Sequence, residues 1–256
     1  TSRSYHLHFT TLLWMYCWFR KQLSRECGIM FYHSHPYPPY IFPDSNRLIV
    51  GTLPPPRFTI GVLNDQDVDF CYGSSNGMLW KIWDQLYSLD LVYKNTPFAV
   101  EQRKSFLRKE KIGICDIVNA AYRDKVDASD LGMQNPELRN ILGILEKFPS
   151  VQTLIFTGGN SKNGPEYFFR KILKQAGLKY VCINNNTPRK HQFEYASKVY
   201  VTHSLTAPSG AANRSIGSSQ AYKAAKLENP KYTTFDFRVE QYGRVFLNVP
   251  EKTKSS

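Results

Sequence analysis

The sequence has few cysteines, and no two of them stand at a spacing typical of a metal or redox site. The five cysteines are scattered along a chain of 256 residues: Cys17, Cys27, Cys71, Cys115 and Cys182. The absence of C-x-x-C argues against an iron–sulfur cluster and a disulfide framework, and it fits a reducing, cytoplasmic environment. A zinc site can be drawn from Cys17, Cys27, His33 and His35. Because that spacing matches no familiar zinc pattern, we expect no metal ion and no other cofactor.

Long hydrophobic runs are also missing. The apolar run FTTLLWMYCWF, residues 9–19, is too short to cross a bilayer, and no small-residue cleavage site follows it. Basic residues come next, at Arg20, Lys21 and Arg25. This order predicts an amphipathic helix packed against the domain, within a helical extension over residues 1–32. We expect a soluble monomer with no membrane partner.

Acidic residues are few relative to basic ones. The chain has 33 lysines and arginines against 21 aspartates and glutamates, a net charge of +12 at pH 7. An excess of this size suits a polyanionic partner, nucleic acid first and an anionic membrane surface second. The hydrophobic fraction of 42%, with 16 tyrosines and 16 phenylalanines, is typical of a folded globular chain. The nucleotide-binding motifs G-x-x-x-x-G-K-[ST] and G-x-G-x-x-G are absent, so nucleotide hydrolysis and dinucleotide redox chemistry lose support.

Short apolar runs alternate with helix-like stretches. Four runs predict buried strands, and a fifth is weaker: 47–52, 111–118, 153–159, 198–204 and, weakest, 179–184. Amphipathic stretches predict helices near 77–89, 97–109, 135–148, 162–176 and 217–227. Residues 228–256 add a C-terminal helix and tail. The alternation predicts one α/β domain over residues 1–256, with a mostly parallel sheet covered by helices on both faces.

In such sheets ligands bind beyond the carboxyl ends of the strands. Four loops rich in small and polar residues are expected there: 52–56, 116–119, 158–160 and 203–209. Each alone is typical of a plain turn, but four at one edge predict a cleft. Three prolines stiffen the loop GTLPPP, residues 51–56. The loop HSLTAPSGAANRS, residues 203–215, offers backbone N–H groups and a helix N-terminus to a phosphate.

The segment FCYGSSNGMLWKIW, residues 70–83, allows two interpretations. Ser74, Ser75 and Asn76 are all favourable N-cap residues, so a simple helix start accounts for them. Alternatively, the segment places an exposed amide, flanked by aromatic residues and glycine, at the mouth of the cleft.

Several segments together resemble the uracil-DNA glycosylase superfamily, in the branch that contains the hypoxanthine-DNA glycosylases. They lie within residues 33–227 in motif order: HPYPPYIFPDSNRLIVGTLPPPRF, FCYGSSNGMLW, GICDIV, LIFTGG and HSLTAPSGAAN. The resemblance implies a three-layer α/β/α sandwich with a short parallel sheet, which agrees with the prediction above. It also implies a monofunctional DNA glycosylase, which hydrolyses the N-glycosidic bond of an extruded uracil, hypoxanthine or modified base and leaves an abasic site.

The resemblance implies catalytic roles for Asn76, Asp116 and His203. Base cleavage passes through an oxocarbenium-like sugar, with negative charge growing on the leaving base. Asn76 would orient water and hydrogen-bond the base edge, and His203 would support the leaving base. Asp116 would favour the cationic sugar or act as a base toward water, although a cap or turn aspartate is the alternative.

Base binding is implied for Phe70 or Tyr72, which would stack on the extruded base unless they are core aromatics. Asn160 and Thr52 would also lie beside the base. The GTLPPP motif lacks the Asp or Asn that water-activating members carry, and Thr52 stands nearby instead. DNA contacts are expected from three loops, through Pro54, Pro55, Ser209, Gly210 and Arg214, and through Arg189 and Lys190 of TPRKHQ.

Other functions remain open at the level of sequence. A glycosylase of this kind acts either on ordinary lesions, as in DNA repair, or on bulky modified bases of phage DNA, as in antiviral defence. A protein that kept the fold, lost catalysis and only binds nucleic acid is a second possibility. A nuclease is disfavoured because acidic residues are sparse in the four loops.

Overall fold

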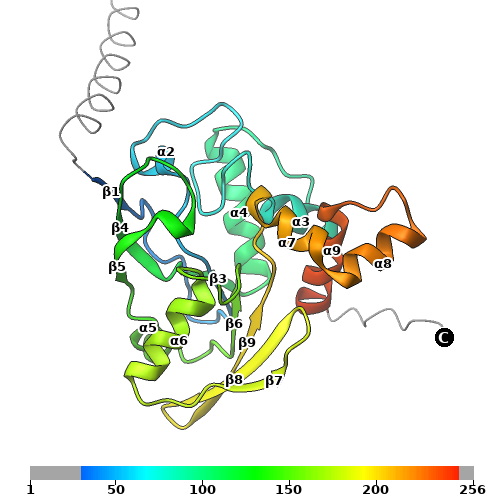
Figure 1. The fold of residues 1–256 in the computed structure, drawn as a ribbon. Helices are drawn as coiled ribbons and strands as arrows, with labels where there is room; N and C mark the ends of the chain where they lie inside the picture. Colours follow the sequence, from blue (N-terminus) through cyan, green and yellow to red (C-terminus); the bar gives the residue numbers. More distant parts are fainter. Residues whose placement is uncertain (1–29, 248–256) are drawn as a thin grey trace, which may run out of the picture.

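The computed structural model describes residues 30–247, whose strands form two sheets (Figure 1). The larger sheet has six strands in the order β3-β2-β6-β9-β8-β7. Their bounds are β2 (Arg47–Val50), β3 (Ile112–Ile114), β6 (Thr153–Phe156), β7 (Val181–Asn184), β8 (Arg189–Tyr195) and β9 (Lys198–Ser204). Strands β3, β2, β6 and β9 are parallel, and β8 runs antiparallel to both β9 and β7. The expected, mostly parallel central sheet is confirmed.

The smaller sheet is antiparallel and was not predicted. It has the order β1-β4-β5, with bounds β1 (Phe31–Ser34), β4 (Val118–Arg123) and β5 (Gln134–Leu138). The run 111–118 was expected to be one strand, but it divides: β3 ends at Ile114 and β4 begins in the other sheet at Val118. Between them the backbone still follows β2, since the N–H groups of Cys115 and Ile117 donate to the carbonyls of Ile49 and Gly51. The side chain of Asp116 accepts a hydrogen bond from the backbone N–H of Gly51.

The helices follow the predicted order, with different limits. The longer ones are α3 (Leu79–Tyr87), α4 (Pro97–Lys109), α5 (Ile141–Lys147), α6 (Pro165–Gln175), α8 (Gln220–Glu228) and α9 (Thr234–Phe246). Shorter turns are α2 (Pro56–Thr59), α7 (Asn213–Ser218) and the 3-10 helices η1 (Asp130–Gly132) and η2 (Gly210–Ala212). The helix expected over 135–148 is wrong in its first half, which forms β5. Polar residues and Pro136 fill β5, so no apolar alternation marks it as a strand.

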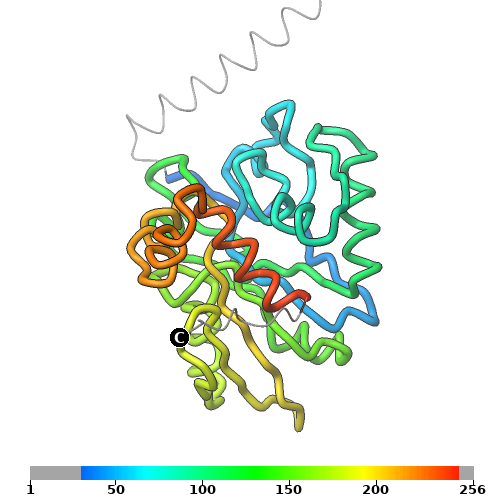
Figure 2. The backbone as a smooth tube through the Cα atoms, turned by 90° about the vertical axis from the view of Figure 1, so that its right-hand side faces the viewer, coloured from blue at the N-terminus to red at the C-terminus, as the bar shows by residue number. Residues whose placement is uncertain are grey.

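Helices cover both faces of the large sheet. Leu48 and Val50 of β2 pack in one core with residues of α5 and α6, whereas Ile49 packs in a second core with residues of α3, α4 and α9. This alternation follows from the opposite directions of successive side chains on a strand. The result is a three-layer α/β/α sandwich, as predicted (Figures 1 and 2).

Strand β8 corrects another expectation. Residues 187–192, TPRKHQ, were expected to form a DNA-binding loop, but β8 begins at Arg189 and pairs with β9 along its whole length. The inward positions are His191 and Phe193, both buried. A histidine and charged neighbours hide the period of two that would have identified the strand.

Some expectations lie outside the described residues: the apolar run 9–19, most of the N-terminal extension over 1–32, Cys17, Cys27 and the tail after residue 247. Phe31 and Tyr32, expected within that extension, belong instead to β1. Within residues 30–247, no helix is both long enough and apolar enough to span a membrane.

Candidate active site

The carboxyl ends of three neighbouring parallel strands meet at one point. Gly51 follows β2, Asp116 lies beyond β3, and Thr157 follows β6. The hydroxyl of Tyr72 joins them, because it donates to Oδ1 of Asp116 at 2.7 Å and lies 3.0 Å from Oγ1 of Thr157. In Figure 1, β9 runs upward toward α7, so this edge of the sheet faces the top of the view.

Asp116 is a buried carboxylate with three hydrogen-bond donors; its side chain is 8% exposed. Oδ1 accepts from the backbone N–H of Gly51 at 2.8 Å as well as from Tyr72, and Oδ2 lies 2.9 Å from Nε2 of His35. The backbone N–H of Tyr37 donates to Nδ1 of His35 at 3.1 Å. In the neutral ring the proton is therefore on Nε2, where it is donated to Asp116. A buried carboxylate with all these partners is held in one orientation.

Burial and the negative charge of Asp116 raise the pKa of Tyr72 well above its usual value. The hydroxyl therefore stays protonated and acts as a donor. Tyr72 has a positive φ of 58°, and the turn around it is fixed by Gly73, whose backbone N–H donates to Phe70 and whose carbonyl accepts from Val68. This turn directs the Tyr72 hydroxyl toward the strand ends.

Gly51 is required by the closeness of these groups. A Cβ atom at this position would lie 2.1 Å from the hydroxyl oxygen of Tyr72, 2.7 Å from Oδ1 of Asp116 and 2.9 Å from Oγ1 of Thr157. No side chain fits there without breaking the arrangement. The site therefore depends on glycine directly after β2.

Asn76 is exposed, and the helix-cap interpretation of its segment is wrong. Helix α3 begins at Leu79, and its N-cap is Met78, with no side-chain cap hydrogen bond. Within residues 30–247 the side chain of Asn76 has no hydrogen-bond partner. Its amide is free to bind a ligand.

A buried aspartate fixes the turn that carries Asn76. Asp67 is 0% exposed and accepts from Arg57 at 2.7 and 2.8 Å and from the backbone N–H of Ser75 at 2.7 Å. Burial alone would raise the pKa of Asp67, but the Arg57 guanidinium and the N–H groups outweigh it and lower that pKa. Arg57 also donates to Oγ of Ser74 at 2.7 Å. The backbone before Asn76 is thus held by an ionised pair.

The sequence Gly73-Ser74-Ser75-Asn76-Gly77 also spells G-x-S-x-G. In hydrolases with that motif the serine sits on a sharp turn directly after a strand. Here the segment follows a series of turns, with no strand immediately before it. Within the described chain no histidine hydrogen-bonds to Ser75. A serine hydrolase is therefore not supported.

The loop after β9 lies against the Asn76 segment. The backbone N–H of Met78 donates to the carbonyl of Pro208 at 2.9 Å. Arg238 of α9 is fully buried and donates to the carbonyls of Ala207 at 3.0 Å and Ser209 at 2.6 Å. Helix α9 therefore holds this loop in place through Arg238. In the loop, Ser209 is half-buried and Gly210 is exposed.

The other predicted catalytic and base-binding residues are placed differently. His203 lies near the end of β9, whose bounds are those predicted for the strand over 198–204, with Lys190 as its cross-strand neighbour. Burial, with a smaller effect from Lys190, lowers the pKa of His203 to about 4, so its ring is neutral at pH 7. Phe70 is 6% exposed and packs edge-on against Tyr40 with ring centroids 5.4 Å apart. Base stacking by Phe70 stays a prediction, and it requires these core contacts to open.

Thr52 and Asn160 lie at the expected edge. Thr52 is half-buried and donates to Oδ1 of Asp130 at 2.7 Å, and Asn160 is exposed after β6. The prolines Pro54 and Pro55 lead into α2, where Pro55 is the N-cap. All four remain candidates for substrate contact.

The basic residues predicted to contact DNA differ in their exposure and in whether they already form an ion pair. Arg214 is exposed on α7, and Lys190 is half-buried at the start of β8. Arg189 instead forms an ion pair with Glu166, which is 0% exposed and also binds Arg170 at 2.7 Å. Arg189 is therefore engaged in a structural pair, while Arg214 is available to a phosphate.

Sequence reasoning missed four residues of this region: His35, Thr157, Asp130 and Arg238. His35 stands in the proline-rich segment HSHPYPPY, where it was considered only as a zinc ligand.

Within residues 30–247 no cluster of three or more His, Cys, Asp or Glu side chains is placed to hold a metal ion. His33 and His35 are bound instead to Arg123 and Asp116.

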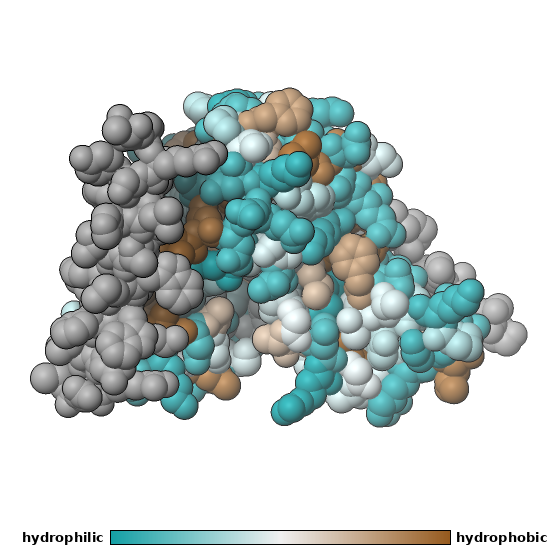
Figure 3. All heavy atoms as spheres, turned by 90° about the horizontal axis from the view of Figure 1, so that it is seen from above, coloured by the Kyte–Doolittle hydropathy of each residue, from teal (hydrophilic) through white to brown (hydrophobic). Residues whose placement is uncertain are grey.

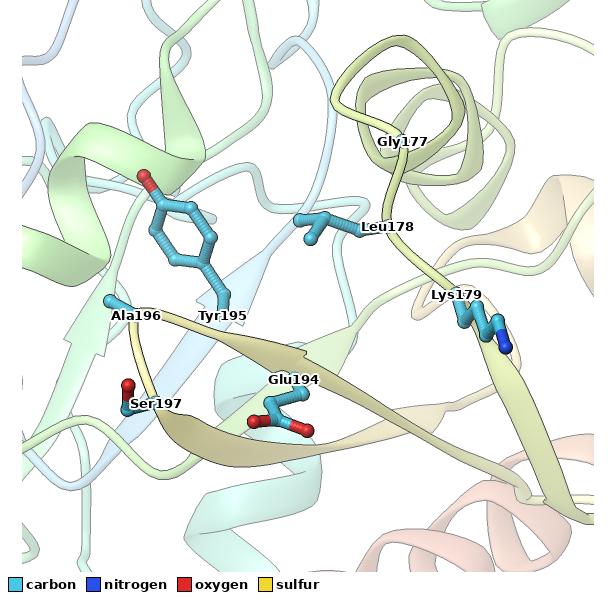
Figure 4. A pocket seen from close by; sticks show the side chains of 7 residues that line it. All are labelled: Gly177, Leu178, Lys179, Glu194, Tyr195, Ala196 and Ser197. Carbon is cyan, nitrogen blue, oxygen red and sulfur yellow. The ribbon is translucent and has the colours of Figure 1, made fainter.

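One surface hollow lies at the opposite edge of the sheet. A hollow of about 360 Å³ is lined by Gly177, Leu178, Lys179 and residues 194–197 (Figure 4). Because Lys198 begins β9, this hollow lies at the amino ends of the parallel strands, opposite Asp116. In Figure 4, Leu178 and Tyr195 lie on one side, while Lys179 points away from them. Where Figure 3 shows this face in colour, hydrophilic residues predominate, with smaller hydrophobic patches between them.

Sequence comparisons with known proteins give no match, and the structural comparison gives a weak likeness. No protein-family model matches the chain, and no curated protein does. One solved structure that is similar is the solution NMR structure of "a putative Uracil DNA glycosylase from Methanosarcina acetivorans". The similarity covers 82% of this chain and 99% of that one, at 18% sequence identity and a TM-score of 0.47. The functional proposal therefore depends on the side chains of the site.

Proposed function

We propose that the protein binds DNA and hydrolyses the N-glycosidic bond of a base rotated out of the helix, leaving an abasic site. The observation that carries this proposal is the position of Asp116, a buried carboxylate fixed by Gly51, Tyr72 and His35 at the ligand-binding edge of the sheet. Cleavage of the bond places positive charge on the sugar. A negative charge that is already oriented stabilises that charge without reorganising during the reaction.

Asn76 supplies a neutral amide to the same reaction. Its side chain is exposed and has no partner within residues 30–247, and the Met78–Pro208 hydrogen bond fixes its segment beside the loop after β9. An amide donates and accepts hydrogen bonds without adding charge. It can therefore orient a water molecule and bind the edge of a leaving base.

The charge of the chain supports DNA as the substrate. The net charge is +12, and Arg214 is exposed on the short helix that follows the loop fixed by α9. Chemistry on a base requires its removal from the stack. Phosphate contacts by such basic residues hold the backbone while the base is extruded.

The decisive experiment is base release from defined oligonucleotides. Single- and double-stranded substrates with one uracil, one hypoxanthine or one bulky modified pyrimidine are incubated with the protein and then heated in alkali, which cleaves abasic sites. We expect cleavage at one of these bases, and Asp116→Asn should lower the single-turnover rate by about 100-fold or more. Preference for the bulky base would favour a role in defence against phage DNA.

The controls separate catalysis from binding. Asp116→Asn keeps the shape of the side chain, so its melting temperature and its DNA affinity are measured beside the rate. DNA binding by the wild-type protein with no alkali-sensitive product from any substrate would contradict the proposal, and would indicate a binding protein of the same fold.

A further inference from the structure

A second carboxylate, Asp130, reaches the site from a different part of the chain. It begins η1, in the connection between β4 and β5. Thr52 donates to Oδ1 of Asp130 at 2.7 Å, and its neighbour Gly51 donates to Oδ1 of Asp116 at 2.8 Å. Two consecutive residues after β2 therefore bind the two carboxylates.

The backbone of Asp130 is anchored from the β6–α6 connection. Nδ2 of Asn163, which is 6% exposed, donates to the carbonyl oxygens of Asp130 and Met133, both at 3.0 Å. Thr52 and Asn163 come from segments that follow two parallel strands. Asp130 is thus held against the same edge of the sheet as Asp116.

The two carboxylates differ in their free acceptor positions. Both oxygens of Asp116 are occupied, Oδ1 by Gly51 and Tyr72 and Oδ2 by His35. Asp130 is half-buried, and within residues 30–247 its Oδ2 has no hydrogen-bond partner. Of the two groups, Asp130 has the oxygen that can accept a hydrogen bond from a water molecule.

The surroundings of Asp130 suit proton transfer near neutral pH. Burial raises the pKa of Asp130 to about 6, the Thr52 hydroxyl and the Arg123 guanidinium oppose this rise, and the charge of Asp116 adds to it. Arg123 is itself buried and donates to His33 at 2.7 Å. A carboxylate with such a pKa is mostly ionised at pH 7 and is a stronger base than an ordinary aspartate.

We propose that Asp130 is the general base of the site, which takes a proton from the water that attacks the sugar, while the Asp116 carboxylate stabilises the positive charge. This inference rests on the proposed glycosidic hydrolysis. The water oxygen bonds to C1′ of the deoxyribose as the bond from C1′ to the base nitrogen breaks, and that electron pair leaves with the base. One water proton passes to Asp130 and then through solvent to the released base. One water is consumed, C1′ gains a hydroxyl, and Asp130 is regenerated.

The test is the pH dependence of the single-turnover rate, measured on the oligonucleotide whose base the wild-type protein releases. For the wild type we expect the rate to fall as the pH drops through about 6, as Asp130 takes up a proton. Asp130→Asn should lower the rate at pH 7 by about 100-fold or more and abolish this acid limb. Asp124→Asn, a matched change at an exposed side chain between β4 and β5, should change the rate by less than about twofold.

The Thr52→Val variant tests whether Asp130 acts as the base or only holds Thr52 in position. The Thr52 hydroxyl stabilises the ionised form of Asp130, so its removal should move the acid limb to higher pH while the limb persists. This variant also tests the proposal if Asp130→Asn does not fold. A Thr52→Val enzyme with the same loss as Asp130→Asn and an unmoved limb would overturn the inference.

The two proposals fail in different ways. Base release by Asp130→Asn at the wild-type rate, with the acid limb intact, would overturn the role of Asp130 and leave glycosidic hydrolysis standing. Absence of release by the wild-type protein from every substrate would overturn both.

Discussion

The backbone N–H of Met78 donates to the carbonyl oxygen of Pro208 at 2.9 Å, so the segment before α3 and the loop after β9 form one unit. Arg238 of α9 holds the same loop through Ala207 and Ser209. Asn76 and the proposed DNA-contacting loop are therefore displayed together on a rigid support. Substrate positioning of this kind contributes to catalysis because small displacements of reacting groups are costly.

Asn76→Ala should lower the single-turnover rate of base release by about 100-fold. Because the side chain has no partner within residues 30–247 and does not cap α3, the free energy of unfolding should change by less than about 0.5 kcal/mol. Asn95→Ala, at another exposed asparagine, is the matched control and should leave both quantities unchanged. A destabilised but fully active Asn76→Ala protein would show that the residue is structural.

Gly51→Ala should disrupt the site. The added methyl group would lie 2.1 Å from the Tyr72 hydroxyl oxygen, so Tyr72 or the backbone must move, at a cost of about 1–3 kcal/mol. Gly217→Ala is the control, since nothing lies within 4 Å of its Cβ position. It should keep activity and gain up to about 1 kcal/mol of stability, because alanine is the better helix former. Denaturant titration and single-turnover rates test both; equal activity of the two variants would contradict the site described here.

Arg214→Ala should mainly weaken DNA binding, whereas Arg189→Ala should mainly lower the stability of the fold. Loss of exposed Arg214 should weaken DNA binding and reduce the slope of log affinity against log salt by about one unit. Loss of Arg189 removes a partner of the fully buried Glu166 and should cost about 1–3 kcal/mol of stability. Fluorescence anisotropy at several salt concentrations and denaturant titration measure the two effects. An unchanged salt slope for Arg214→Ala would remove it from the DNA interface.

Because His203 is buried in its neutral form, the free energy of unfolding should fall in mild acid. Burial, with Lys190, lowers its folded pKa to about 4 from 6.5, so between these values the unfolded state binds more protons than the folded state. Stability is therefore lost as the pH falls from about 6.5 toward 4, by about 2 kcal/mol between pH 7 and pH 5. His203→Gln should lose correspondingly less than the wild type over that interval in urea unfolding. An identical loss in both proteins would contradict a neutral, buried His203.

The sequence alone determined the layered fold because its signal is local. Apolar runs such as 153–159 and 198–204 predict buried strands without knowledge of their partners. In the same way, the spacing of four and then three residues between Phe235, Val239 and Tyr242 predicts a helix. Strand β8 and the small sheet were missed, since His191 is buried there beside Arg170 and Tyr180, and Pro136 and polar residues form β5. Their pairing partners, not their own pattern, make them strands.

The candidate active site, too, was predicted only in part from the sequence. The position of Asp116 at the end of an apolar run was enough to predict that it lies at the carboxyl edge of the sheet. Its three donors, and the approach of Asp130 to Thr52, come from segments far apart in the chain. Only the tertiary structure decided these, because a hydrogen bond depends on distances of about 3 Å between folded segments, which no local spacing in the sequence encodes.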